Sequence, residues 1–188
     1  VGSEMCIRDS IKTPEQVQPR EWLRVDDKPV VWEACQTLNG SWGYDRDNLD
    51  WKSVDMLVQM LIDTVSKGGN LLLNVGPTGR GQFDPKAIER LEGIGRWMKL
   101  HGRSIYGATQ SEFPSPRDCR LTQRGDRLYV HVFTWPFKHL HLDGMAGKVE
   151  YAQLLNDASE IRMQESRETG VLTLLLPIQK PDVTVPVI

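Results

Sequence analysis

Apolar residues between positions 54 and 75 change their spacing from that of a helix to that of a strand. From 54 to 65 they stand three and four positions apart, which predicts one amphipathic helix. Ser53 is suited to cap its start, and Gly68-Gly69 is suited to end it in left-handed geometry. The run 71–75 that follows is too short for a helix and apolar on both faces, so it predicts a strand of a parallel sheet.

Two further segments extend this pattern into repeated strand–helix units. The sequence "PVVWEAC" (29–35) predicts another short strand upstream, and Asp84-Pro85 has the order of a helix cap and a first helical residue. Strands that alternate with helices form a parallel sheet, and the loops after the strands carry the chemistry. The segments 36–48 and 76–82 are therefore expected on a functional rim.

After about residue 105 the apolar spacing becomes that of a sheet. Short runs rich in β-branched and aromatic residues alternate with Gly, Asp and Asn turns, which is typical of an antiparallel sandwich. Strands are expected at 127–135, 148–155 and 171–177.

The first ten residues, "VGSEMCIRDS", follow none of these patterns. They lack the apolar segment of a signal peptide, and they look like the translation of a sequencing adapter. We therefore interpret residues 1–10 as a non-native segment, with Cys6 in it, and expect the chain to be a piece of a longer protein.

Composition removes several classes of function. Among 188 residues, 39% are apolar and the net charge is -2, which describes an ordered globular protein with no electrostatic reason to bind nucleic acid. No apolar run approaches the roughly 18 residues of a membrane span. The three cysteines and four histidines show no metal-ligand or disulfide spacing. "GPTGRG" lacks the ending of a phosphate-binding loop, so we expect neither a metal nor a nucleotide cofactor.

Polar residues near the predicted rim are the candidates for chemistry. Asn70 and Asn74 stand at the two ends of the apolar run, where each is either hydrogen-bonded within the protein or faces a site. Trp42, in the Gly-flanked loop "GSWGY", could stack on a sugar face or a methyl group, or simply pack within its loop. Glycoside hydrolysis needs two carboxylates. The carboxylates available are Glu15, Glu33, Asp45, Asp47 and Asp50. Most of them are expected to be ordinary solvated charges on the surface.

Two longer stretches carry motifs in a specific order: "WEACQTLNGSWGYDRDNLDWKSVDMLVQMLIDTVSKGGNLLLNVGPTGRG" (32–81) and "RLEGIGRWMKLHGRSIYG" (90–107). They closely resemble the C-terminal half of the catalytic barrel of α-L-fucosidases, glycoside hydrolase family 29. The resemblance covers about residues 11–108. It implies an α/β fold in which residues 11–108 form the C-terminal part of a (β/α)8-type barrel. Residues 109–188 would then form an all-β antiparallel sandwich domain.

The resemblance also implies roles for individual residues. Glu15, in "TPEQ", corresponds to the general acid/base of the family, and Trp42 corresponds to the aromatic residue that packs against the C6 methyl group of fucose. The nucleophile Asp of the family, with its His, Tyr and Arg contacts to the sugar, lies upstream of the residues present. Asn74 would hold the backbone of the rim beside the sugar pocket, and Asn70 would cap the start of its strand.

The implied activity is that of a retaining exo-α-L-fucosidase, which hydrolyses terminal α-L-fucose from fucosylated glycans without a cofactor or metal. This chain alone is expected to be inactive. The alternative is a non-catalytic carbohydrate-binding protein with a barrel-like scaffold, and a pseudo-enzyme homologue is a third possibility. Members of the family are often secreted, periplasmic or lysosomal, and any signal peptide is expected in the missing N-terminal part, so the location stays open. The sequence does not indicate an oligomeric state.

Overall fold

The computed structural model describes residues 6–8 and 11–188, and the chain divides into two units, 1–98 and 99–188. Most of the segment that we interpret as non-native, 1–10, lies outside the described residues. None of the helices in the described part of the chain is long and apolar enough to cross a membrane.

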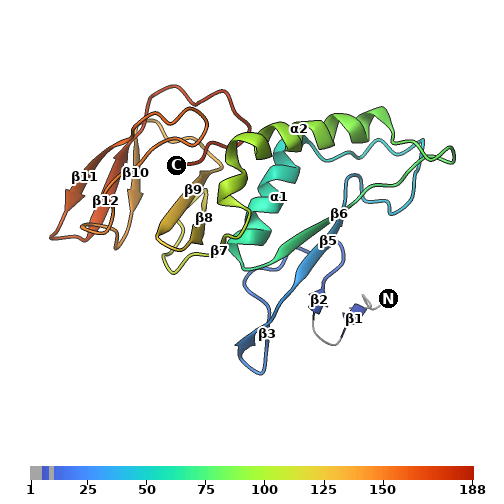
Figure 1. The fold of residues 1–188 in the computed structure, drawn as a ribbon, viewed down its shortest axis with the longest axis horizontal. Helices are drawn as coiled ribbons and strands as arrows, with labels where there is room; N and C mark the ends of the chain where they lie inside the picture. The colour runs from blue at the N-terminus through green and yellow to red at the C-terminus, as the bar shows by residue number, and fades with distance from the viewer. Residues whose placement is uncertain (1–5, 9–10) are drawn as a thin grey trace. The chain divides into compact units, whose positions relative to one another are not determined.

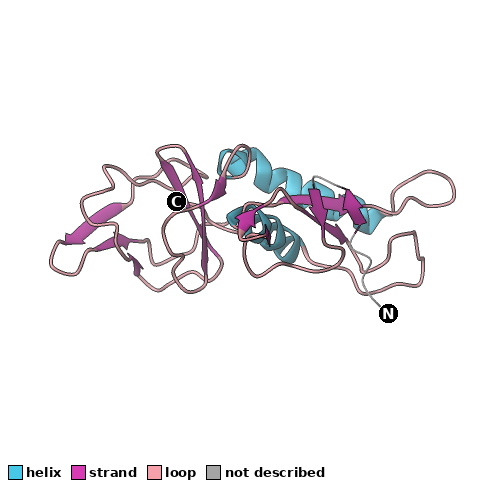
Figure 2. Cartoon of the chain, turned by 90° about the horizontal axis from the view of Figure 1, so that it is seen from below, coloured by secondary structure: helices cyan, strands magenta, loops and turns pink. Residues whose placement is uncertain are grey.

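The first unit contains all of the α-helix of the described chain apart from the end of its last helix (Figures 1 and 2). Its elements are β1 (Cys6–Arg8), β2 (Ile11–Thr13), β3 (Arg24–Val25), β4 (Lys28–Pro29), β5 (Glu33–Thr37), α1 (Val54–Ser66), β6 (Asn70–Asn74) and α2 (Pro85–His101). Strands β5 and β6 are parallel, with Glu33 opposite Asn70 and Thr37 opposite Asn74, and α1 connects them. This confirms the predicted strand–helix–strand–helix order.

All three predicted helix caps are present. The Ser53 hydroxyl accepts a hydrogen bond from the Met56 amide at the start of α1 (3.1 Å), and Gly68 has φ +72° just after its end. The Asp84 carboxylate accepts from the Lys86 amide at the start of α2 (2.8 Å). Sequence alone therefore located these helix boundaries closely.

The strand predicted at 29–35 begins later than expected. Lys28–Pro29 instead pairs with Arg24–Val25 in a separate antiparallel hairpin, and β5 starts only at Glu33. Asp26 and Asp27 both adopt positive φ, 49° and 60°, which is the geometry of a tight two-residue hairpin turn. Pro29 and Val30, at the start of the apolar run, therefore pair with the hairpin and not with the parallel sheet.

A third parallel segment lies beside β5. Isolated parallel bridges join Lys12 to Trp32 and Glu15 to Cys35. The Cys35 amide donates to the Pro14 carbonyl (3.0 Å), and the Gln16 amide donates to the Cys35 carbonyl (2.9 Å). The segment 11–16 therefore runs alongside β5 on the side opposite β6.

The helices cover one face of this small sheet (Figure 1). Leu38, Leu57 of α1 and Ala87 of α2 are buried together, and Leu73 and Val75 pack against them. The other face carries Glu33, Cys35 and Asn70, together with Leu72, which is 48% exposed. The described residues do not close a barrel, since only β5 and β6 form a parallel ladder, with segment 11–16 at its edge.

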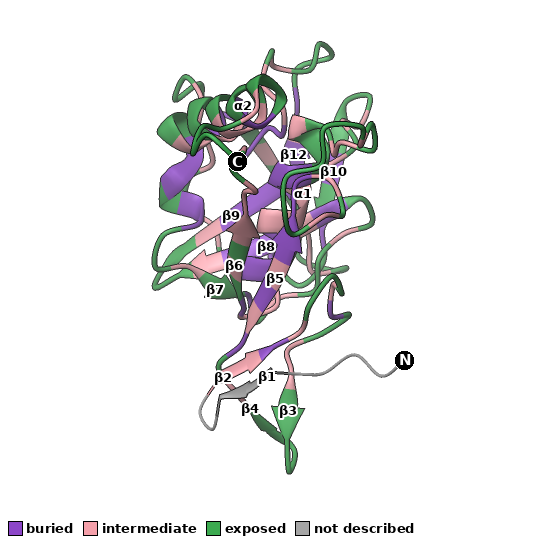
Figure 3. Cartoon of the chain, turned by 90° about the vertical axis from the view of Figure 1, so that its right-hand side faces the viewer, coloured by how far each residue is buried: buried purple, intermediate pink, exposed green. Residues whose placement is uncertain are grey.

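The second unit, after its share of α2, consists of short strands. The 3₁₀ turn η1 (Gly102–Ser104) precedes them. The strands are β7 (Thr109–Gln110), β8 (Cys119–Arg124), β9 (Arg127–Val132), β10 (His139–Leu142), β11 (Arg162–Ser166) and β12 (Val171–Leu175). They form two antiparallel sheets, ordered β7-β8-β9 and β10-β12-β11. Leu121 and Val130 of the first sheet share one buried core with Leu140 and Leu172 of the second. Figure 3 shows the buried parts of strands β8 and β9 and the exposed hairpin strand β3.

The strand predicted at 148–155 is wrong. Gln153 makes only an isolated bridge with Glu160, and the segment otherwise follows turns. Leu154 is buried, and Val149 and Ala152 pack against the core, so these apolar residues contribute to the core without a regular strand. Strands β8 and β11 were not predicted, because polar side chains interrupt their apolar pattern.

A polar chain is buried at one end of the second unit. The Thr122 hydroxyl donates to the Ser104 carbonyl (2.7 Å) and lies 3.0 Å from Nε2 of His131. Because the single hydroxyl proton of Thr122 is used toward Ser104, Nε2 of His131 donates its proton to the Thr122 hydroxyl. Burial, followed by the neighbouring His101, lowers the pKa of His131 to about 3.

Candidate active site

The candidate site is the edge of the first unit where segment 11–16, β5 and β6 end. All three run in the same direction, so their carboxyl ends meet at one edge, which is where chemistry is placed in parallel α/β folds. This edge is formed by residues Glu15, Thr37 and Asn74, and by the loop 38–53 that follows β5.

Glu15 lies at the end of the edge segment, paired with Cys35 of β5. Its backbone is held in this parallel bridge, and the residue is exposed. Gln16 follows with φ 54° and donates from Nε2 to the Thr37 hydroxyl (3.0 Å). The chain therefore turns sharply just after Glu15 and is tied to the end of β5.

The loop 38–53 is held by hydrogen bonds between side chains and backbone. The Thr37 hydroxyl accepts from the Gly40 amide (2.8 Å), and Nδ2 of Asn48 donates to the Asn39 carbonyl (2.9 Å). Nζ of Lys52 donates to the Thr37 carbonyl (2.6 Å), and burial lowers the pKa of this ammonium group. The loop has a defined shape although it contains no strand or helix.

Trp42 stands on this loop and is held from the neighbouring strand. Nδ2 of Asn74, at the end of β6, donates to the Trp42 carbonyl (2.7 Å). Gly76 lies so close to the loop that an added Cβ would be 2.6 Å from the Gly43 carbonyl carbon. The Trp42 side chain remains 43% exposed, and Tyr44 is 38% exposed. The backbone of Trp42 is thus fixed while its ring is accessible to a ligand.

The two asparagines of β6 are both hydrogen-bonded within the protein. The prediction that Asn74 holds the rim backbone is confirmed by its bond to Trp42. Nδ2 of Asn70 donates to the Trp32 carbonyl at 3.4 Å, so it ties the start of β6 to the residue before β5. This agrees with the expectation that Asn70 caps the start of its strand, and the structure identifies the Trp32 carbonyl as the partner.

The other carboxylates fit the expectation of structural or surface charge. Asp45 accepts from the Asp47 amide (3.0 Å), and Asp47 forms a largely solvated ion pair with Arg46 (3.4 Å). Glu33 accepts from the Thr13 hydroxyl (3.3 Å). Asp50 is exposed on the loop. Within the described part of the chain, no group of three or more His, Cys, Asp or Glu residues is placed to hold a metal ion.

Segment 11–16 and β6 flank β5, so about 10 Å separates the backbones that carry Glu15 and the anchor of Trp42. One carboxyl group and one accessible aromatic ring on the same rim provide a proton donor or acceptor and an apolar contact. Gln16 and Thr37, which fix the turn after Glu15, were missed from the sequence, because nothing in their spacing indicates that they meet.

The sequence profile of the family described as "Alpha-L-fucosidase" matches residues 1–103 of this chain. Plasma α-L-fucosidase of Rattus norvegicus is 33% identical over 160 residues, which is 78% of this chain and 34% of the relative. The chain thus spans about a third of the length of this curated relative.

Solved structures agree. Alpha-L-fucosidase isoenzyme 1 from Paenibacillus thiaminolyticus matches with a TM-score of 0.89 and 36% identity, over 95% of this chain and 44% of that one. A GH29 α-L-fucosidase from Bacteroides thetaiotaomicron matches with a TM-score of 0.79 and 25% identity, over 93% of this chain and 42% of that one. That enzyme was trapped as a covalent intermediate with 2-fluoro-fucosyl fluoride in a glutamate-to-glutamine mutant.

Proposed function

The chain belongs to the α-L-fucosidase family, glycoside hydrolase family 29, and from this we propose that it is part of a retaining exo-α-L-fucosidase acting on terminal α-L-fucose of glycans. The observation that carries the proposal is the placement of Glu15. A carboxyl group stands at the carboxyl end of a parallel segment, on the same rim as the anchored Trp42.

In the proposed mechanism Glu15 acts first as acid and then as base. As an acid it protonates the glycosidic oxygen while an Asp nucleophile attacks the anomeric carbon, and as a base it activates the water that hydrolyses the fucosyl-enzyme. The covalent intermediate trapped in the Bacteroides thetaiotaomicron relative supports a double displacement. Trp42 packs against the C6 methyl group of fucose. The carboxyl chemistry requires no cofactor or metal.

The nucleophile is assigned to a part of the enzyme upstream of this chain. The chain spans only 44% of the Paenibacillus thiaminolyticus relative, which leaves ample length for the remaining barrel strands. A retaining pair needs its two carboxyl groups about 5 Å apart. We therefore expect the missing Asp on a barrel strand that faces Glu15 across the sugar.

The proposed architecture follows the family. Residues 11–108 would form the last strands and helices of a (β/α)8-type barrel, and residues 109–188 a sandwich domain. The family profile ends at residue 103 and β7 begins at Thr109, which supports a boundary near 108. In the closed barrel, the face that carries Cys35 and Leu72 would line the interior.

The acid/base role is tested in the full-length enzyme with Glu15→Gln. Hydrolysis of fucosides with poor leaving groups should fall by at least about 100-fold, because general acid catalysis typically contributes 10²–10⁴. With an activated aryl α-L-fucoside, whose leaving group needs little protonation, the variant should still form the fucosyl-enzyme, and only the hydrolysis of that intermediate should be slow. Added azide should then restore turnover by forming the fucosyl azide. Glu33→Gln serves as the matched control, and an equal loss in both variants would remove Glu15 from the role.

The isolated 188-residue chain provides a second test. It is expected to show no turnover of an aryl α-L-fucoside beside a full-length relative, because the double displacement has no nucleophile. Turnover near that of the relative, lost on Glu15→Gln, would show that the chain contains a complete site. If the full-length protein binds fucosylated glycans but hydrolyses none, the non-catalytic alternative holds instead.

A further inference from the structure

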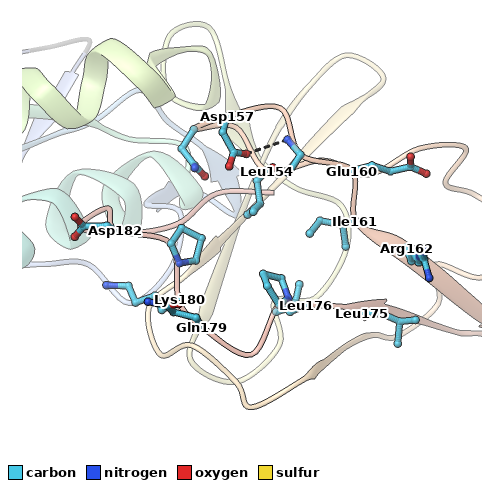
Figure 4. Close-up of a pocket in the computed structure, with 14 residues that line it drawn as sticks. Leu154, Asp157, Glu160, Ile161, Arg162, Leu175, Leu176, Gln179, Lys180 and Asp182 are labelled. Atoms are coloured by element: carbon cyan, nitrogen blue, oxygen red, sulfur yellow. Dashed lines mark hydrogen bonds between the residues drawn. The ribbon is translucent and has the colours of Figure 1, made fainter.

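A groove in the second unit is separate from the candidate active site. It has a volume of about 700 Å3 and lies between segments 154–162 and 175–182 (Figure 4). Leu154, Ile161 and Leu176 form an apolar floor. Glu160 and Arg162 lie toward one side in the view, and Lys180 and Asp182 toward the other.

Several polar groups of this groove have no partner among the described residues. Oδ1 of Asn156 is buried and accepts no hydrogen bond. A buried amide oxygen without a hydrogen bond costs about 1–3 kcal/mol of folding free energy. A ligand that donates a hydrogen bond to this oxygen would remove that cost. Glu160, Arg162 and Asp182 make no side-chain hydrogen bond or ion pair with the rest of the described chain.

The wall of the groove formed by residues 154–159 is held by hydrogen bonds. The Leu154 amide donates to the Ser159 carbonyl (2.9 Å), and the Leu155 amide donates to the Val187 carbonyl (2.8 Å). The Asp157 carboxylate accepts from the Ser159 amide (2.9 Å), and hydrogen bonds from Ser159 lower the pKa of Asp157 (Figure 4). A ligand would therefore meet a pre-formed wall on this side of the groove, which reduces the entropic cost of binding.

We propose that this groove binds a neutral saccharide unit of a glycan. Its charged residues are three carboxylates, of Asp157, Glu160 and Asp182, and two cations, of Arg162 and Lys180, so no single sign of charge selects an ionic ligand. Sugar hydroxyls both donate and accept, which matches the unpartnered carboxylates, arginine and amide oxygen. The C–H face of a sugar ring fits the apolar floor.

The volume lies within the range of about 300–1,000 Å3 for small-molecule sites. No aromatic side chain lines the groove, so the stacking that strengthens sugar binding is missing. We therefore expect a dissociation constant of about 1 mM. The choice of a sugar over other neutral polar molecules rests on the proposed glycan-processing function.

The test is an NMR titration of the ¹⁵N-labelled 188-residue chain with N-acetyllactosamine. Amide shifts should concentrate at residues 154–162 and 175–182. Glu160→Ala and Arg162→Ala should each weaken binding by at least about tenfold, because hydrogen bonds to charged groups are the strong ones. Both side chains are exposed, so neither change should disturb folding. Glu168→Ala, an exposed carboxylate in the turn between β11 and β12, is the matched control and should bind like the parent.

Parallel titrations use tetralysine and tetraaspartate. The proposal is overturned if the saccharide causes no shifts in the groove, if the groove variants bind as well as the control, or if either peptide binds more tightly. Because the titration measures binding without catalysis, its failure leaves the fucosidase proposal intact. Conversely, if the full-length protein hydrolyses no fucoside, specific binding of N-acetyllactosamine in the groove would still support the saccharide site.

Discussion

Asn74 shows how a polar residue in an apolar strand can serve a site without touching a substrate. Its side chain ends β6 and holds the carbonyl of Trp42 on the loop that follows β5. Glu15 is held in a comparable way by the backbone pairing with Cys35 and by the turn at Gln16. At the residue scale the rim is thus organised by hydrogen bonds between neighbouring parallel strands.

Replacing Asn74 by Ala should loosen the Trp42 loop while the fold is retained. The lost hydrogen bond has a net value of about 1 kcal/mol, which corresponds to roughly a fivefold fall in kcat/KM of the full-length enzyme for an aryl α-L-fucoside. The loss should lie mainly in KM, because Trp42 is proposed to contact the bound sugar. Asn70→Ala, which removes a long 3.4 Å bond at the other end of β6, is the control. Equal effects of the two variants would separate Asn74 from the site.

His131 should make the second unit sensitive to acid. Its pKa is lowered from 6.5 to about 3, so between these values the unfolded chain binds a proton that the folded chain does not. The free energy of unfolding should therefore fall as pH decreases from 6.5 toward 3, by at most about 1.4 kcal/mol per pH unit.

This sensitivity is measured by urea unfolding at pH 7 and pH 5, followed by the NMR amide signals of the second unit, because six tryptophans contribute to the fluorescence of the chain. His131→Gln should flatten the dependence on pH, even if it lowers stability at pH 7, because the titrating group is gone. His141→Gln is the control, since His141 is exposed and lies 2.9 Å from the Thr173 hydroxyl. An unchanged pH dependence in His131→Gln would assign the acid sensitivity to other groups.

Among the elements, the loop 38–53 depends on the close approach of β6. Gly76 follows β6 and lies against the backbone of Gly43 and Tyr44, where a Cβ would be 2.6–2.7 Å from backbone atoms. Backbone cannot rotate away as the end of a flexible side chain can. Glycine at position 76 therefore allows the loop to approach β6 this closely, in addition to the hydrogen bonds that hold it.

Gly76→Ala should displace the loop and increase its mobility. Arg46 lies on this loop and is largely exposed, so trypsin should cleave after Arg46 several times faster in the variant. Gly79→Ala is the matched control, because no atom lies within 4 Å of a Cβ built there. If both variants are cleaved at the same rate, the contact with Gly43 does not hold the loop.

For the whole molecule, one face of the β5–β6 sheet is left uncovered by the described residues. Leu73 and Val75 pack against the helices, whereas Leu72 is 48% exposed on the opposite face. In the proposed full-length enzyme this face lines a closed barrel. The same residue should therefore contribute differently to stability in the two contexts.

Leu72→Ala should change the melting temperature of the isolated chain only slightly, because the side chain is already half exposed. In the full-length enzyme the same change should lower the free energy of unfolding by about 2–5 kcal/mol, as for a buried leucine. Leu73→Ala is the comparison, and it should destabilise both proteins. A small effect of Leu72→Ala in the full-length enzyme would contradict the closed barrel.

Local features were predicted well where short-range chemistry determines them. The start of α1 at Ser53, its end at Gly68 and the start of α2 at Asp84-Pro85 depend on caps within a few residues, and all are present. The parallel strand β6 followed from an apolar run between two helices. The wrong strand at 148–155 had an apolar pattern too, but Leu154 reaches the core from a turn, which pattern alone does not distinguish from a strand.

The sequence by itself determined the helices of the first unit, the change to short strands after about residue 105 and, through its motifs, the family. Only the tertiary structure decided that segment 11–16 pairs in parallel with β5, that Asn74 binds Trp42, and which face of β6 is covered. The first two features join residues 20 and 32 positions apart in the chain. Contacts over such separations depend on how strands and helices pack against one another, and that packing leaves no periodic signal in the sequence.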